Sequence, residues 1–201
     1  AGQSPAAAER SVSRVLAQTY DNWDLTVVSD TRATPHVPRN RRQRIVVIED
    51  STPAARVNAA LPRCDGDFVV VIGPDDVLYP GSFDALAAAL SVNPDADIVY
   101  GGDDIAVLVV DHQGVEHAAR RDPFFKPGWN PELLHSMPYL GHVTWFRTSQ
   151  VVAADGLRDL PGGELWDLAL RLTRGGATVA HAEGIVAGRV TGVPPVPDAT
   201  A

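Results

Sequence analysis

Apolar residues in the first half of the chain alternate between two kinds of spacing. Some recur every three or four residues, as in a helix that buries one face, and others form short continuous runs, as in buried strands. The predicted helices cover residues 6–18, 51–61 and 82–90, and the predicted strands cover residues 25–28, 44–48, 68–72 and 97–100. This alternation predicts an α/β fold with a mostly parallel central sheet and helices on both faces.

The second half of the chain has shorter elements. A hairpin is predicted from residues 105–110 and 115–119, and it is followed by helices at 131–136, 149–154 and 164–173 with strands at 142–146 and 177–180. The last residues include the string V-P-P-V-P, which favours an extended linker. We therefore predict one domain, residues 1–190, followed by a flexible tail, residues 191–201.

Composition restricts the partners of this domain. The chain has 201 residues, and its 25 acidic residues outnumber 17 lysines and arginines to give a formal net charge of −8. Binding to nucleic acid requires a basic face, so nucleic acid is excluded as a partner. The single Cys64 fits a reducing compartment, and no apolar run approaches the ~20 residues that span a bilayer. A cytoplasmic location is predicted, and the arginines within residues 39–44 leave open a contact with the cytoplasmic face of the membrane.

Two acidic pairs, Asp75-Asp76 and Asp103-Asp104, follow two of the predicted strands. Ligands of open parallel sheets bind outside the carboxyl ends of the strands, so both pairs are expected at one edge. Carboxylates that crowd together repel one another unless a cation compensates, and a hard divalent cation can also bridge a diphosphate. The alternative for the first pair is a simple turn, because Pro-Asp-Asp is good turn chemistry without any ligand.

Three further side chains are candidates, each with a structural alternative. Asp30 follows the predicted strand 25–28 and suits a hydrogen bond to a base or ribose, or the capping of a loop. His181 follows the last predicted strand and is either a metal ligand or a structural residue. Trp166 either stacks on a sugar face or fills the core.

Several segments, in a consistent order over roughly residues 10 to 190, resemble the family 2 glycosyltransferases, which have the GT-A fold. The similar segments are 16–25 (L-A-Q-T-Y-D-N-W-D-L), 60–76, 97–104, 125–134 (F-K-P-G-W-N-P-E-L-L) and 166–171, with Tyr139, Gly141, His142, Arg147 and His181 at further matching positions. The resemblance implies transfer of a sugar from a nucleoside diphosphate donor, with Mg or Mn and with inversion at the anomeric carbon. It implies a UDP- or GDP-linked donor and a glycan or lipid-linked acceptor.

The resemblance also implies roles for the candidate residues. Asp75 and His181 are expected at the metal, and Asp30 at the nucleoside. The other expected substrate-binding residues are Asp103, Asp104, Lys126 and Trp166.

The chain departs from the family pattern at three places. The usual first strand is lacking, the first carboxylate of the metal motif is replaced by Gly73, and the general base position holds Leu165. An inverting transferase needs a proton acceptor beside the acceptor hydroxyl, so Glu164 and Asp167 are the candidate catalytic residues. Successive helix positions point about 100° apart, which puts both away from the usual place of the base. The alternative hypothesis is a catalytically degenerate GT-A-like module that binds or scaffolds within a larger protein, with further domains or a partner chain.

Overall fold

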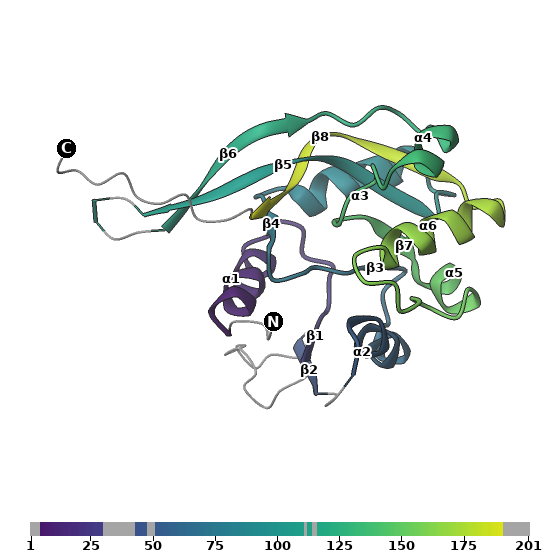
Figure 1. Ribbon diagram of the computed structural model, residues 1–201, viewed down its shortest axis with the longest axis horizontal. Coiled ribbons are helices and arrows are strands. Elements are labelled where there is room, and N and C mark those ends of the chain that lie inside the picture. The colour runs from purple at the N-terminus through teal and green to yellow at the C-terminus, as the bar shows by residue number, and fades with distance from the viewer. Residues whose placement is uncertain (1–4, 30–42, 48–50, 111, 114–115, 191–201) are drawn as a thin grey trace.

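The structure is a computed structural model that describes residues 5–29, 43–47, 51–110, 112–113 and 116–190 (Figure 1). The helices are α1 (Pro5–Leu16), α2 (Pro53–Ala60), α3 (Ser82–Val92), α4 (Pro131–Ser136), α5 (Thr148–Ala153) and α6 (Glu164–Arg174), with a short 3₁₀ helix at Leu61–Arg63. The strands are β1 (Leu25–Ser29), β2 (Gln43–Val47), β3 (Phe68–Val70), β4 (Asp76–Leu78), β5 (Ile98–Val110), β6 (Glu116–Phe124), β7 (Trp145–Arg147) and β8 (Val179–Val190). Asp30, the predicted tail 191–201 and most of the arginine-rich segment lie outside the described residues.

The strands form a six-stranded sheet in the order β3-β7-β5-β8-β4, with β6 paired to β5, and a separate two-stranded sheet of β1 and β2. The α/β class is as predicted, but the strand directions differ from the mostly parallel sheet that we expected. In the six-stranded sheet β5 runs parallel to β8, while β3–β7, β5–β7, β4–β8 and β5–β6 are antiparallel. For the pair β5–β6 the reason is the short connection between the two strands, because a parallel neighbour requires a long crossover.

Helices cover both faces of the sheet, as predicted. Successive residues of β5 point to opposite faces, and the side chains on each face pack against helices. Ile98 and Tyr100 enter a core cluster with Leu134 of α4 and Leu168 of α6. Val99, between them, enters a second cluster on the other face, with α1 and α3. All three of these β5 residues are fully buried. The same alternation continues along β5 into its acidic residues.

Capping residues begin two of the helices, α2 and α4. The Thr52 side chain accepts a hydrogen bond from the Ala55 N–H before α2, and the Asn130 side chain accepts one from the Leu133 N–H before α4. Both helices have proline in the first turn, where its missing N–H costs nothing. These signals are readable from sequence, and the predicted starts of both helices are confirmed within two residues.

A bulge in β8 bends the sheet beside the site. Gly101 pairs with Ala182 but Gly102 pairs with Ile185, so β8 carries two extra residues, one of which is Gly184 with a φ of 85°. A side chain at Gly102 would meet the Gly184 carbonyl oxygen at 2.6 Å, so the strands can approach this closely only at glycine. Bulges of this kind re-aim side chains next to functional sites. Beyond the bulge, β5 and β6 extend as a ribbon away from the helices (Figure 1).

None of the described helices is long and apolar enough to cross a membrane.

Candidate functional site

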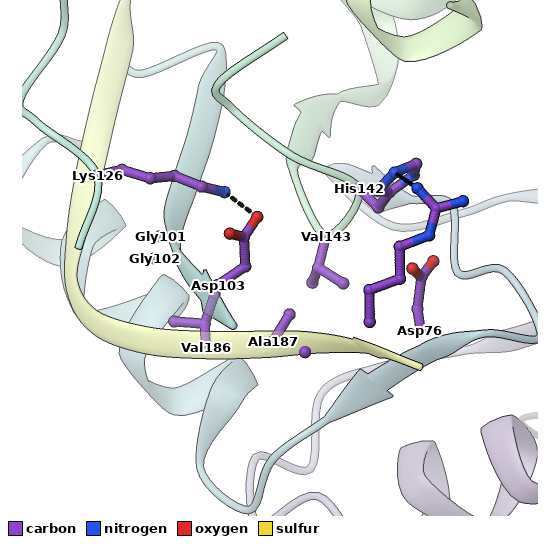
Figure 2. Close-up of a pocket in the computed structure, with 11 residues that line it drawn as sticks. Asp76, Gly101, Gly102, Asp103, Lys126, His142, Val143, Val186 and Ala187 are labelled. Atoms are coloured by element: carbon purple, nitrogen blue, oxygen red, sulfur yellow. Dashed lines mark hydrogen bonds and ion pairs between the residues drawn. The ribbon is translucent and has the colours of Figure 1, made fainter. Parts of the chain in front are cut away.

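A small cavity of about 20 Å³ lies between two groups of charged side chains. Figure 2 shows Lys126 and Asp103 on one side and His142 and Asp76 on the other, with Val143 between them. Gly101 and Gly102 of β5 and the end of β8 complete the lining. The site therefore lies beside the bulge between β5 and β8, where two glycines of β5 form part of its lining.

Lys126 and Asp103 form an ion pair with 2.7 Å between Nζ and Oδ2. The Lys126 side chain is only 3% exposed, and its Nζ also donates to the Leu140 carbonyl at 2.8 Å, whereas the Asp103 side chain is 33% exposed. Burial lowers the pKa of Lys126, and the Asp103 carboxylate opposes that shift. Lys126 thus fixes the orientation of a carboxylate that remains open to a ligand.

The backbone of Gly141 closes over this ion pair. Gly141 has a φ of 80°, and a Cβ built on it would lie 2.6 Å from Asp103 Oδ2 and closer still to Lys126 Nζ. Two independent constraints, a left-handed backbone and the lack of space, therefore require glycine here.

Asp76 is the carboxylate on the opposite side of the small cavity. It begins β4 opposite Arg189 of β8, and it accepts a hydrogen bond of 2.7 Å from the Gly73 N–H. Burial raises the pKa of Asp76, and the Gly73 hydrogen bond and the neighbouring His142 and Arg189 oppose the shift. Arg189 also contacts His142 through Nη1 and Nε2. Asp76 is thus a buried carboxylate with basic groups beside it.

A larger cavity of about 410 Å³ opens beside the small one and shares Asp76, Asp103 and His142 with it. Its other walls come from α2, from residues 71–73 after β3, from residues 137–142 before β7 and from the start of α6. Glu164, Leu165 and Trp166 of α6 all line it. The volume is that of a pocket for a small organic ligand.

The two acidic pairs are split by the structure, so that one member of each reaches the cavities. Asp103 and Asp76 line both cavities, whereas Asp75 is exposed and lines neither. Asp104 points to the opposite face of β5, where it binds Arg120 Nε at 2.7 Å and the Tyr79 hydroxyl at 2.5 Å. Of the two acidic pairs predicted at one edge of the sheet, Asp76 and Asp103 line the cavities, on opposite sides of the small one (Figure 2).

The two candidate catalytic residues of α6 also separate. Asp167 accepts from Arg171 Nε at 2.7 Å and pairs with Arg158 at 3.5 Å, and it lines neither cavity. Arg171 in turn donates to the carbonyls of Ala154 and Gly156, so Asp167 belongs to a structural network after α5. Glu164 faces the larger cavity.

His181 and Trp166 lie in different surroundings. The His181 ring packs 4.8 Å from the Tyr100 ring, and burial lowers the His181 pKa. His181 lies in β8, where it pairs with Tyr100 of β5. Arg189, which pairs with Asp76 of β4, lies eight residues further along β8. The structure therefore does not bring His181 to one ion with Asp75, and the described residues contain no cluster of three His, Cys, Asp or Glu that could hold a metal. Trp166 lines the larger cavity and donates from Nε1 to the Leu134 carbonyl at 2.7 Å, which fixes its ring.

Sequence reasoning assigned no role to His142, Arg189 or Gly141, all of which shape the site. His142 and Gly141 belong to a segment that matches the family pattern, so a signal was present for them. No sequence signal was present for Arg189, because it reaches Asp76 only through the pairing of β4 with β8. These two residues are 113 positions apart in the chain.

The structure has the fold of the GT-A glycosyltransferases, as two solved structures show. The structure aligns with a TM-score of 0.62 to TarS 1–349 of S. aureus in complex with UDP-GlcNAc, with 13% identity over 94% of this chain and 57% of that one. It aligns with a TM-score of 0.60 to the mannosyltransferase PcManGT of Pyrobaculum calidifontis in complex with GDP-Man and Mn²⁺, with 16% identity over 98% of this chain and 56% of that one.

The chain belongs to glycosyltransferase family 2, because the model of that family, Glycosyl transferase family 2, matches residues 3–150. It is 31% identical over 181 residues to the O-antigen biosynthesis protein RfbC of Myxococcus xanthus, covering 85% of this chain and 14% of that protein. It is 27% identical over 127 residues to the putative glycosyltransferase EpsE of Bacillus subtilis, covering 59% of this chain and 44% of that protein. The matched part of the chain thus spans less than half of the length of either relative.

Proposed function

We propose that this domain transfers a sugar from a nucleoside diphosphate sugar to an acceptor hydroxyl, with inversion and with a divalent cation. The observation that carries the proposal is that Asp76 and Asp103 both line the two adjoining cavities. The small cavity has basic groups on both sides, and the larger one has the volume of a sugar-sized ligand. Solved structures of the same fold contain UDP-GlcNAc in one case and GDP-Man with Mn²⁺ in another, which supports a UDP- or GDP-linked donor.

The residues present suit Mg²⁺ or Mn²⁺ that the donor shares. Carboxylate oxygens are the ligands that such hard cations prefer, and Mg²⁺ is usually held by one or two carboxylates together with substrate phosphates. Asp76 and Asp103 are two such carboxylates, and the proposal needs no third protein ligand. We assign to Asp76 the role at the metal that the resemblance implies for Asp75, because Asp76 lines both cavities and Asp75 lines neither. When bound, the cation would neutralise charge on the diphosphate leaving group.

The remaining side chains fit the two substrates. Lys126 holds the Asp103 carboxylate toward the cavities, where it can accept hydrogen bonds from sugar hydroxyls. Trp166 offers a fixed aromatic wall to a sugar face. Glu164, at the start of α6, is the carboxylate on the acceptor side, and we assign it the role of general base that removes the proton of the attacking hydroxyl.

Calorimetric titration of UDP and of GDP, each with and without Mn²⁺, tests the donor site. We expect binding that depends on Mn²⁺ in the wild type and a loss of about tenfold or more in Asp76→Asn, since charge-assisted contacts contribute about 1.5–3 kcal/mol. Asp75→Asn is the matched control, because it makes the same change one residue away on a side chain that lines neither cavity. A folded protein that takes up neither nucleotide would refute the proposal and favour the degenerate module. Equal losses in the two variants would refute the assignment of Asp76.

Turnover over a panel of UDP- and GDP-sugars tests the base. Glu164→Gln should lower kcat and leave nucleotide binding unchanged, because the amide keeps the size of the side chain but accepts no proton. If Asp167→Asn lowers kcat as much at unchanged stability, the base is Asp167 and the assignment of Glu164 is wrong.

A further inference from the structure

Two strands of this domain, one from each sheet, have a strand beside them at only one edge. Among the described residues, β1 pairs only with β2, and β3, at the end of the six-stranded sheet, pairs only with β7. The two-stranded sheet stands apart from the larger one (Figure 1). An open strand edge offers a row of backbone N–H and C=O groups to which another strand can bind.

β1 and β3 lie between the same two layers of side chains. On one face, Leu25 of β1 and Val70 of β3 pack against the core cluster that contains Val15 of α1. On the other face, α2 contacts β1, and Ala54 of α2 belongs to the cluster against which Val69 of β3 packs. The two strands therefore share their neighbours on both faces, although they are not paired with each other.

The side chains of these strands are only half-buried. This holds for residues 25–28 of β1 and for the continuous apolar run 68–72 that begins with β3. By contrast, Ile98 and Val99 of β5, which have β7 on one side and β8 on the other, are fully buried. A continuous apolar run is typical of a strand covered on both faces. The run 68–72 thus has the composition of a central strand but the exposure of an edge strand.

The two strands also run in the same direction. β1 is parallel to β2, and α2 connects β2 to β3. A helical crossover of this kind joins parallel strands, so β1 and β3 are parallel as well. A single strand can therefore pair with both of them at once.

We propose that the space between β1 and β3 is a slot that binds one extended apolar segment of polypeptide and so joins the two sheets into one. The segment is uncharged and mostly apolar, because the clusters on both faces are apolar, and it has no internal proline, because its N–H groups pair with both edges. It comes from outside the 201 residues, since the longer stretches beyond the described residues, 30–42 and 191–201, contain proline and no continuous apolar run. RfbC and the TarS structure both contain much polypeptide outside the region that this chain matches. The slot does not depend on the proposed function.

The test is binding of a synthetic peptide to the whole chain. The peptide has about six successive valine, isoleucine and threonine residues, the usual length and composition of a strand, with a lysine at each end for solubility. Fluorescence anisotropy measures its affinity at concentrations where the peptide alone is monomeric, and hydrogen–deuterium exchange locates it. We expect slower exchange of the amides of β1 and of residues 68–72, and unchanged exchange in β4 and β6.

Two N-methylated peptides test whether both edges of the slot are used. Successive N–H groups of a strand point to opposite edges, so methylation of alternate residues blocks one edge and leaves the other intact. Methylation of either set should weaken binding by about tenfold or more, because each blocked amide loses a hydrogen bond at a buried edge. A peptide that extends the open edge of only one sheet would tolerate one of the two sets.

Four results would overturn the inference. They are tolerance of one methylated set, failure of the folded chain to bind the peptide, and slower exchange confined to strands other than β1 and β3. The fourth is a dimer in which the amides of β1 and β3 are protected without any peptide, because a second copy of the chain would then cover both edges. None of these results bears on nucleotide binding, which tests the proposed function separately.

Discussion

The ion pair of Lys126 and Asp103 gives a sharp prediction for the glycine above it. Gly141→Ala adds one methyl group at a φ of 80° and places it against both charged groups. An alanine in a left-handed conformation costs roughly 1–2 kcal/mol. Overpacking adds about 1–3 kcal/mol, because Lys126 is buried and cannot move aside without weakening its ion pair. The free energy of unfolding should therefore fall by about 2–5 kcal/mol.

Gly81→Ala separates the two contributions. Gly81 has a φ of 79°, almost that of Gly141, but a Cβ built on it meets no atom within 4 Å. It should lose only the backbone part, about 1–2 kcal/mol. Urea denaturation followed by circular dichroism measures both variants under one condition. If Gly141→Ala is no less stable than Gly81→Ala, the ion pair is not packed against Gly141 as the structure has it, and our account of how Asp103 is positioned fails.

Three further predictions concern residues around the site. Lys126→Met should lower the free energy of unfolding by about 1.5–3 kcal/mol, measured by urea denaturation, because Asp103 loses a charge-assisted hydrogen bond but is exposed enough to regain water. Asp167→Ala should lower the free energy of unfolding by a similar amount, because it leaves Arg171 without its carboxylate partner. Calorimetry should find nucleotide binding unchanged in this variant, and weakened binding at full stability would contradict the prediction. Burial holds the pKa of folded His181 below 6.5, so as the pH falls the unfolded chain takes up a proton on this histidine before the folded protein does. The contribution of neutral His181 to stability is therefore complete above pH 6.5 and is lost below it. His181→Phe should show a smaller fall of the urea midpoint between pH 7.5 and 5.5 than the wild type.

The sequence predicted the helices well because their signals are local, but it did not predict β4 (Asp76–Leu78) and placed only a short strand where β8 (Val179–Val190) lies. Proline near the start of α2 and α4 and the 3–4 spacing of apolar residues in α6 depend on neighbours in the chain. The strand directions were predicted less well, because pairing joins segments far apart in sequence. β3 pairs with β7, and β4 pairs with β8, across long stretches of chain. A pattern of alternating elements favours parallel neighbours but contains no information on which strands become adjacent.

The candidate site was predicted to the level of the segment but not of the side chain. The sequence predicted two separate strands, at 97–100 and 105–110, whereas β5 runs from Ile98 through both acidic residues to Val110. In a continuous strand neighbours point to opposite faces, so Asp103 and Asp104 could not both reach one ligand. The ion pair of Asp167 with Arg171 was readable, since residues four apart on a helix are neighbours. Its presence would have favoured Glu164 alone as the base.

The structure also changes the argument for a metal. From sequence, carboxylates crowded at one edge of the sheet required a cation to offset their repulsion. In the structure each carboxylate already has basic groups beside it, Lys126 at Asp103 and both His142 and Arg189 near Asp76. Repulsion therefore no longer requires a metal. Under the proposed function a need for one arises instead from the donor, because a diphosphate would bring two or more negative charges to a place where basic side chains already lie beside the carboxylates. A cation that depends on the donor in this way should bind weakly alone and tightly with UDP or GDP, which is the reason to titrate Mn²⁺ with and without nucleotide.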